Sequence, residues 1–176
     1  INSTTTNQLT LEAGTTLFLT GSALNNKLIN LPNGKLELLA GTTITQGSHA
    51  GGSINAGTLI LGKCAACSTN PSVTLTNASN QIANLQASNV SSVSVNSSTA
   101  MTVNVSNISS TGAVSLTSNS TVTLTGSITT TDTTSGNVSI QATGLAGAGN
   151  IALASGRDLT VNQSGSSTYS GIISGS

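Results

Sequence analysis

The stretch VSLTSNSTVTL, Val114–Leu124, contains the pattern that decides the fold: two apolar-x-apolar beats separated by polar residues. Such a beat restarts about every ten residues along the chain. It occurs at Leu9-x-Leu11, Leu17-x-Leu19, Leu36-x-Leu38, Leu59-x-Leu61, Val73-x-Leu75, Val93-x-Val95, Val103-x-Val105, Val114-x-Leu116, Val122-x-Leu124, Val138-x-Ile140, Ile151-x-Leu153 and Leu159-x-Val161. The alternation predicts short strands with one apolar face, which are buried only when similar strands stack on them. We therefore expect an all-β protein, a β-solenoid.

Composition favours an ordered, narrow solenoid. Of the 176 residues, 5% are charged and 1% are aromatic, while Ser and Thr together number 58. Disorder normally accompanies high charge and few β-branched residues. This chain has zero net charge and abundant Val, Ile and Thr, which favour strands. Since large side chains are too few to fill a wide interior, we expect a narrow core of Val, Leu, Ile and Ala.

Charge and hydropathy exclude two classes of partner. The chain has four cations spread along its length, too few for the basic stripe that neutralises nucleic-acid phosphates. They are Lys27, Lys35, Lys63 and Arg157. No apolar run approaches the roughly 18 residues of a membrane span, so we expect no membrane insertion. The chain starts at Ile1 without Met and without a signal-peptide pattern, which indicates a mature form or an excised segment.

The chain is expected to form one continuous solenoid over residues 1–176. No segment holds a helical apolar period, and glycine-containing turns separate strands of about four to seven residues. Two or three strands form one coil of roughly 20 to 25 residues. About eight coils at ~4.8 Å each would make a rod roughly 40 Å long. Residues 1–62 are expected to form wider coils rich in Leu and Gly, whereas residues 63–176 are expected to form regular coils rich in Ser, Thr and Asn. The segment Ser48–Ser53, which contains His49, is interpreted as a loop that leaves the rod.

Two phrases resemble known bacterial repeats. GNIALASGRDLTV, residues 149–161, closely resembles the repeats of filamentous haemagglutinin-like exoproteins, which are secreted by a two-partner route. STYSGIISGS, residues 167–176, is similar to a repeat of autotransporter passengers. Both resemblances imply a right-handed parallel β-helix, and many proteins of these groups are adhesins. They also imply a secreted or cell-surface protein of a Gram-negative bacterium.

The sequence Cys64-Ala65-Ala66-Cys67 is the sharpest local feature. In an exported chain, two cysteines this close are expected to form a disulfide that fixes a turn. A haem site would need His after the second cysteine, where Ser68 stands, and a thioredoxin-like role would need a βαβ unit. Zinc would need four ligands, and His49 is the only other good candidate. We therefore expect no metal and no cofactor.

Glu12 and Glu37 raise an enzymatic alternative. They lie 25 residues apart in similar Leu-flanked segments. If one coil had that length, their carboxylates would stack about 5 Å apart, the separation in retaining glycosidases. Parallel β-helices do include polysaccharide-cleaving enzymes, but such sites need several converging acids and bases. Since both side chains alternate with inward Leu, we expect them to be solvated, and the chain to be non-enzymatic.

Hydroxyl and amide residues suggest two further hypotheses. Thr121, Thr123 and Thr125 face outward together, as do Thr74 and Thr76, and outward Thr ladders are used by ice-binding solenoids. The corresponding outward residues elsewhere are mixed, which disfavours ice binding. They are Ser94, Asn104, Ser115 and Ser139.

Asparagine has two possible roles along the chain. Nine Asn-x-Ser/Thr sequons permit glycosylation, although a ladder of Asn stacked inside the rod is the preferred interpretation. The sequons begin at Asn2, Asn77, Asn89, Asn96, Asn104, Asn107, Asn119, Asn137 and Asn162.

Two functional hypotheses follow. The first is a structural, non-enzymatic rod module of a bacterial surface or secreted adhesin-type exoprotein, whose partners are host or bacterial surfaces, with glycans among the candidates. The second is the subunit of a self-assembling extracellular filament that stacks through its ends. Exposed strand edges template further strands, and Ile1, Ile172 and Ile173 leave apolar residues at both termini.

Overall fold

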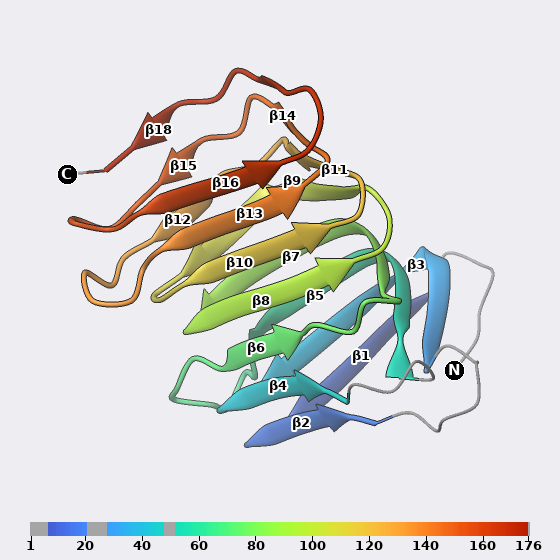
Figure 1. The fold of residues 1–176 in the computed structure, drawn as a ribbon. Helices are drawn as coiled ribbons and strands as arrows, with labels where there is room; N and C mark the ends of the chain where they lie inside the picture. The colour runs from blue at the N-terminus through green and yellow to red at the C-terminus, as the bar shows by residue number, and fades with distance from the viewer. Residues whose placement is uncertain (1–6, 21–27, 48–51, 176) are drawn as a thin grey trace.

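The chain folds as a right-handed parallel β-helix of about seven turns, so the predicted all-β solenoid is confirmed. The computed structural model describes residues 7–20, 28–47 and 52–175. Within these ranges it contains strands and turns and no α-helix. The coils are stacked in chain order, from the first strands at one end of the molecule to the last at the other (Figure 1).

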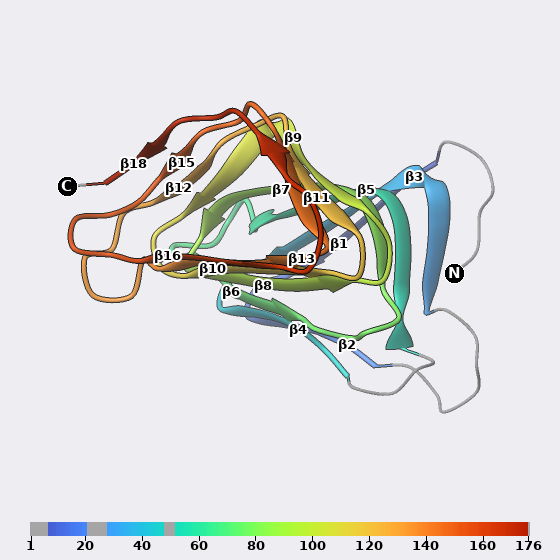
Figure 2. The ribbon, with the colours of Figure 1, turned by 45° about the horizontal axis from the view of Figure 1, so that its top comes forward.

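Two parallel sheets form the sides of the solenoid. The 11-stranded large sheet contains β1 (Gln8–Ala13), β3 (Ile29–Ala40), β5 (Ile54–Lys63), β7 (Gln81–Val90), β9 (Met101–Ser110), β11 (Thr121–Leu124), β12 (Ile128–Thr130), β14 (Gly144–Gly147), β15 (Ile151–Ala152), β17 (Thr168–Tyr169) and β18 (Ile173–Ser174). The seven-stranded small sheet contains β2 (Thr16–Leu19), β4 (Thr43–Gln46), β6 (Ser72–Leu75), β8 (Ser92–Ser97), β10 (Val114–Ser118), β13 (Val138–Ala142) and β16 (Leu159–Gln163). Viewed closer to the stacking direction, the coils superpose and enclose a narrow interior (Figure 2).

Strands of the large sheet bend around a corner of the solenoid. β3 has 12 residues, and β5, β7 and β9 have 10 each, so the expected strand length of four to seven is wrong for these four. Asn107 (φ 69°) is left-handed at a corner inside β9, whereas Asn89 (φ 52°) lies near the end of β7, at a register irregularity between Ala87 and Val90. Asn tolerates this conformation better than most residues. The next coil makes the Asn107 corner with two shorter strands, β11 and β12.

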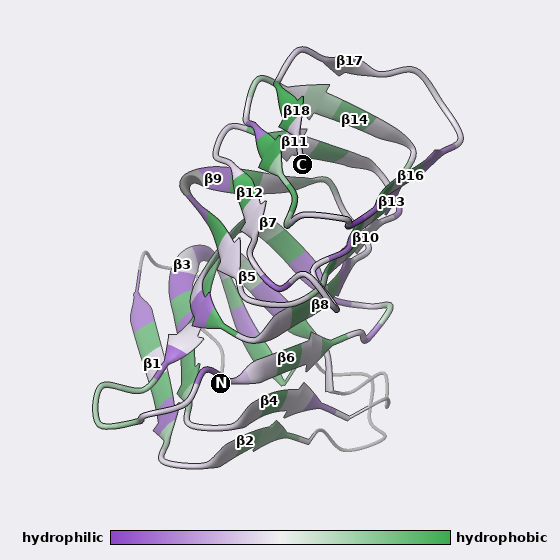
Figure 3. Cartoon of the chain, turned by 90° about the vertical axis from the view of Figure 1, so that its left-hand side faces the viewer, coloured by the Kyte–Doolittle hydropathy of each residue, from purple (hydrophilic) through white to green (hydrophobic). Residues whose placement is uncertain are grey.

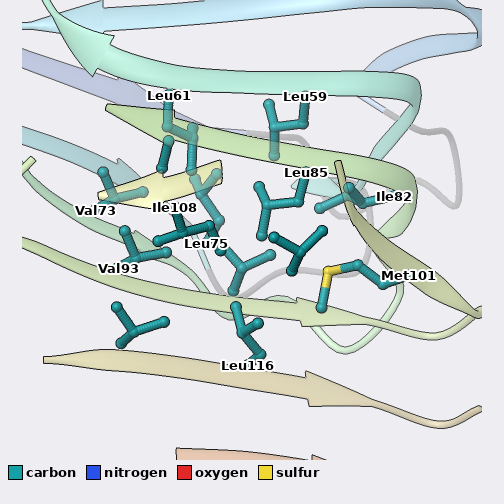
Figure 4. Packing of buried hydrophobic residues seen from close by; sticks show 14 of the residues in the cluster. Leu59, Leu61, Val73, Leu75, Ile82, Leu85, Val93, Met101, Ile108 and Leu116 are labelled. Atoms are coloured by element: carbon teal, nitrogen blue, oxygen red, sulfur yellow. The ribbon is translucent and has the colours of Figure 1, made fainter. Parts of the chain in front are cut away.

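Many inward positions are those that the apolar beats predict, such as Leu36 and Leu59, while others, such as Leu85, lie outside the beats. Leu36 pairs with Leu59, and Leu59 with Leu85, and all three are completely buried. Figure 4 shows side chains from several coils meeting in one shared interior. In Figure 3 the hydrophobic and hydrophilic colours alternate along β1 and β3. Each fully buried Leu or Val contributes about 1.5–3 kcal/mol relative to exposure, so the stack is stabilised coil by coil.

Coil length varies, which corrects the regular spacing assumed above. One coil advances 27 residues between Thr16 and Thr43, but only 20 between Asn107 and Ser127. The structure has about seven turns rather than eight, and β17 and β18 form only part of a further coil. Longer connections between strands account for the extra residues of the early coils.

A column of glycines lines one corner of the last coils. A Cβ on Gly149 would lie 2.1 Å from the carbonyl oxygen of Gly126, and a Cβ on Gly171 would lie 2.1 Å from that of Gly149. Gly126 itself meets the carbonyl oxygen of Asn104. Successive backbones therefore touch at this corner, and only glycine allows the approach.

Candidate functional site

The predicted disulfide is present between Cys64 and Cys67, whose Cα atoms are 5.2 Å apart. The bridged turn follows β5 directly. Cys64 is buried, whereas Ala65 and Ala66 are exposed at the tip. The backbone N–H of Cys67 donates a hydrogen bond to the carbonyl oxygen of Cys64 at 3.1 Å, which closes the turn.

This turn reaches back across two coils. The backbone N–H of Ala65 donates to Glu12 Oε1 at 3.2 Å, and the hydroxyl of Thr69 donates to the carbonyl oxygen of Gly41. Cys67 Sγ lies 3.4 Å from the carbonyl oxygen of Gly14. Since Gly14, Gly41 and the cysteines belong to three successive coils, the turn acts as a brace on the first corner of the rod. We call Cys64–Thr69 the disulfide brace.

Glu12 and Glu37 do not stack, so the glycosidase-like pair is wrong. Glu37 lies opposite Thr10 in the register of β1 and β3, while Glu12 lies opposite Leu39. Here one coil spans 27 residues rather than 25, which displaces the two acids along the strands. Glu37 accepts a hydrogen bond from the Thr10 hydroxyl at 3.0 Å, and Glu12 holds the disulfide brace. Both carboxylates therefore have structural partners.

The ends of the solenoid expose apolar side chains. Val161 and Ile173 occupy inward rows of the last coil and are 39% and 52% exposed, while the neighbouring Ile172 is 66% exposed. At the first coil, Phe18 is 60% exposed and borders an open apolar cavity of about 220 Å³. The cavity is also lined by Leu11, Leu19, Thr20, Leu28 and Ile29. Ile1, proposed as the other joining end, lies outside the described residues.

Outward hydroxyls form a column on the small sheet, which includes the predicted Thr74, but they do not form one at Thr121, Thr123 and Thr125. Thr121 and Thr123 lie opposite Gly144 and Ala146, and the Thr125 hydroxyl donates to the carbonyl oxygen of Val103. The small sheet instead aligns six hydroxyl residues in consecutive coils. They are Thr45, Thr74, Ser94, Ser115, Ser139 and Thr160. The sequence predicted Thr74, Ser94, Ser115 and Ser139 as outward residues of this mixed kind, and the register aligns them. Asn104, predicted with them, lies instead on β9 of the large sheet.

Asn30 and Asn55 form an Asn–Asn pair across two coils, but both alternate with buried residues, so this pair is not the predicted ladder inside the rod. Asn55 Nδ2 donates to Asn30 Oδ1 at 2.7 Å across β3 and β5. Another amide is more deeply placed: Asn80 is fully buried, accepts the N–H of Ile54 at 2.9 Å and donates to the Leu75 carbonyl oxygen at 3.1 Å. Gln46 exchanges two further hydrogen bonds with it, at 2.8 and 2.9 Å. Asn80 therefore satisfies backbone groups where the coils turn.

Asp132 organises an exposed turn between β12 and β13. Its carboxylate accepts hydrogen bonds from the Ser135 hydroxyl at 2.6 Å and from the hydroxyl and N–H of Thr134 at 2.7 and 2.8 Å. These bonds, that of the Ser135 hydroxyl foremost, lower the pKa of Asp132 to about 2. Arg157 Nη1 donates to the Thr134 carbonyl oxygen at 2.9 Å and so ties the turn to the next coil.

The described residues give no support for a metal site or for a membrane-spanning helix. They contain no group of three or more His, Cys, Asp and Glu side chains placed to hold a metal ion. His49 lies outside them. Over the same ranges there is no helix long and apolar enough to cross a membrane. Comparison with protein-family models, curated proteins and solved structures found no match.

Proposed function

We propose that the chain is a structural, non-enzymatic rod module of a secreted or surface-exposed adhesin-type exoprotein. The observation that carries this proposal is the continuous parallel pairing of coil on coil, whose register is unbroken along the small sheet. Along the small sheet, for example, Val93 pairs with Val114, and Val114 with Val138. Each coil presents nearly the same surface to the next, so the rod's length follows from the number of coils.

The setting outside the cytoplasm rests on the disulfide brace and on the resembled repeat. Disulfides form and persist mainly in oxidising compartments. The phrase at residues 149–161 covers one coil segment, in which Ile151 is buried against Ile128 and Leu159 lies opposite Val138. Its apolar positions thus serve as coil-stacking residues, the role that the resemblance to exoprotein repeats implies.

The test is to change the length of the rod by whole coils. Deleting residues 93–113 places Val114 in the position of Val93, and β11 then meets β7 in the existing register. Duplicating the same segment adds one coil and is the matched counterpart. Each change should alter the length by about 4.8 Å per coil while circular dichroism remains β-type. In the cells that produce the protein, adhesion and display should depend on this length. Equal adhesion and display by all three lengths would contradict the spacer function.

A second candidate, the filament subunit, is favoured by the exposed apolar ends. The inward side chains that a further coil would cover are Val161 and Ile173 at one end. At the other end they are the partly buried Leu9, Leu11 and Leu17. If a second copy covers them, sedimentation should show concentration-dependent association, and negative-stain microscopy should show fibres. Val161→Lys with Ile173→Lys should abolish both, whereas Thr160→Lys, on the outward face of the same strand, should not. A monomer at high concentration would remove this candidate.

A further inference from the structure

A polar groove lies where three strands of the small sheet end. It is at the arrowhead ends of β10, β13 and β16 in Figure 1 and has a volume of about 390 Å³. Thr117 pairs with Gln141, and Gln141 pairs with Asn162, so one side of the groove is a row that crosses three successive coils. Asn119 and Thr143 lie two positions further along their own coils, and Ser164 completes this second side.

Most polar side chains of this groove form no hydrogen bond within the described part of the rod. Elsewhere most amides bond within the rod, as Asn84 does to the Gly57 carbonyl oxygen and Asn96 to that of Thr76. The side chains of six groove residues make no hydrogen bond to any residue that the structure describes. They are Thr117, Asn119, Gln141, Thr143, Asn162 and Ser164. Three amides and three hydroxyls are therefore available to a ligand.

The chemistry of the groove matches a ligand rich in hydroxyl groups. Each amide offers both donors and an acceptor, and each hydroxyl offers both in one atom. No charged residue is among those that line the groove, and Ala142 is the one apolar contributor. Successive rows are about 4.8 Å apart, a spacing comparable to the length of one pyranose residue. A chain of neutral sugars could thus place one residue against each coil.

We propose that this groove binds a neutral oligosaccharide that lies along the axis of the rod and contacts three successive coils. Gln141 forms the centre of the site, with Thr117 and Asn162 on the coils either side. The proposal does not depend on the rod function: a spacer of any length could carry the groove, and the groove could be empty in a protein that still works as a spacer.

Other ligands fit the groove less well. Nucleic acids and sulfated glycans require cations, and none lines it. A peptide recognised by its side chains would need apolar pockets, whereas one that adds a strand would need a free sheet edge. The groove crosses β13, which is paired on both sides by β10 and β16. β16 is the terminal strand of the sheet, but a strand added there would leave the rows of Thr117 and Gln141 uncontacted, so a ligand that spans the groove is recognised by side-chain hydrogen bonds.

The test is an NMR titration of the 176-residue chain with cellohexaose, maltohexaose and laminarihexaose in parallel, and with dextran sulfate as the charged probe. At least one neutral hexasaccharide should shift the side-chain amide signals of Asn119, Gln141 and Asn162 in a saturable way. Gln141→Ala with Asn162→Ala should weaken that binding at least tenfold. Gln86→Ala is the matched control, since this half-buried amide lies on β7 and likewise bonds to no described residue.

Several outcomes would overturn the proposal. They are the absence of any shift with all three hexasaccharides, shifts that persist in the double variant, or groove shifts caused only by dextran sulfate. Gln141→Glu gives a second, independent readout, because it keeps the size of the side chain but removes both amide donors. This substitution should weaken binding of the neutral hexasaccharide, as the double alanine variant does. Unchanged backbone amide shifts in β6, which is distant from both substitutions, show that the rod of each variant remains folded.

Discussion

Cys67 Sγ lies 3.4 Å from the carbonyl oxygen of Gly14, although 53 residues separate the two in the chain. Gly41, from the coil between them, fits into the same contact, since a Cβ there would lie 2.9 Å from Cys67 Sγ and 2.1 Å from the Gly14 oxygen. Three coils therefore meet at one point, and the disulfide brace holds them together at the first corner.

Gly41→Ala should destabilise the early coils, because its added methyl group cannot fit between Gly14 and Cys67. Overpacking of this kind typically costs about 1–3 kcal/mol. Urea unfolding followed by circular dichroism measures the loss. The control is Gly14→Ala, where a new Cβ would meet nothing within 4 Å. Equal stability of the two variants would show that the close contact at Gly41 is absent in solution.

Removal of the disulfide through Cys64→Ser with Cys67→Ser should loosen the first three coils more than the last ones. The closed loop is short, so the loss should be below the roughly 3 kcal/mol expected for a loop of about 15 residues. Hydrogen exchange should accelerate in β1 and β3, where the brace acts through Glu12 and Gly41, and remain unchanged in β13 and β16. Uniform acceleration along the rod would contradict a local brace.

Asn80→Ala should be among the most destabilising polar substitutions. It leaves the buried N–H of Ile54 without a partner, and each unsatisfied buried group costs about 1–3 kcal/mol. It also removes both hydrogen bonds to Gln46, whose Nε2 then keeps only the Gly52 carbonyl oxygen. Chemical denaturation should show the loss. The exposed Asn119→Ala should stay within about 0.5 kcal/mol of the parent chain. A small effect at Asn80 would imply that water replaces its bonds.

The turn held by Asp132 should open in acid. Its pKa is lowered from the ordinary 3.8 to about 2, so its hydrogen bonds stabilise the folded turn fully above pH 3.8. That contribution is lost as the pH falls from 3.8 through about 2. The amide signal of Thr134, which donates to Asp132 Oδ1, should titrate in this window. Asp132→Asn should abolish the titration, and a midpoint near 3.8 in the parent chain would contradict the bonds.

The inward residues could be predicted from the sequence, because alternation along a strand is a local property. Leu59, Leu75 and Leu124 belong to predicted beats, and all three are fully buried. The close spacing of Cys64 and Cys67 likewise predicted their disulfide.

Contacts between coils could not be predicted in the same way, because register depends on the length of every connection. An error of two residues per coil separated Glu12 from Glu37. The same dependence concealed the groove, since nothing in the local sequence indicates that Thr117, Gln141 and Asn162 lie side by side. The reach of the disulfide brace to Gly14 also required the stacked coils.

The glycine column at Gly126, Gly149 and Gly171 bears on how such a chain can change over generations. At this corner each backbone rests on the one beneath it, so a single-residue insertion would push a side chain into a neighbouring carbonyl oxygen. A substitution there faces the same collision. Gain or loss of an entire repeat preserves every contact of the column. Variation in related genes should therefore occur as duplications and deletions of repeat length. Between such events, the glycines at this corner should rarely be substituted, and single residues should rarely be inserted beside them.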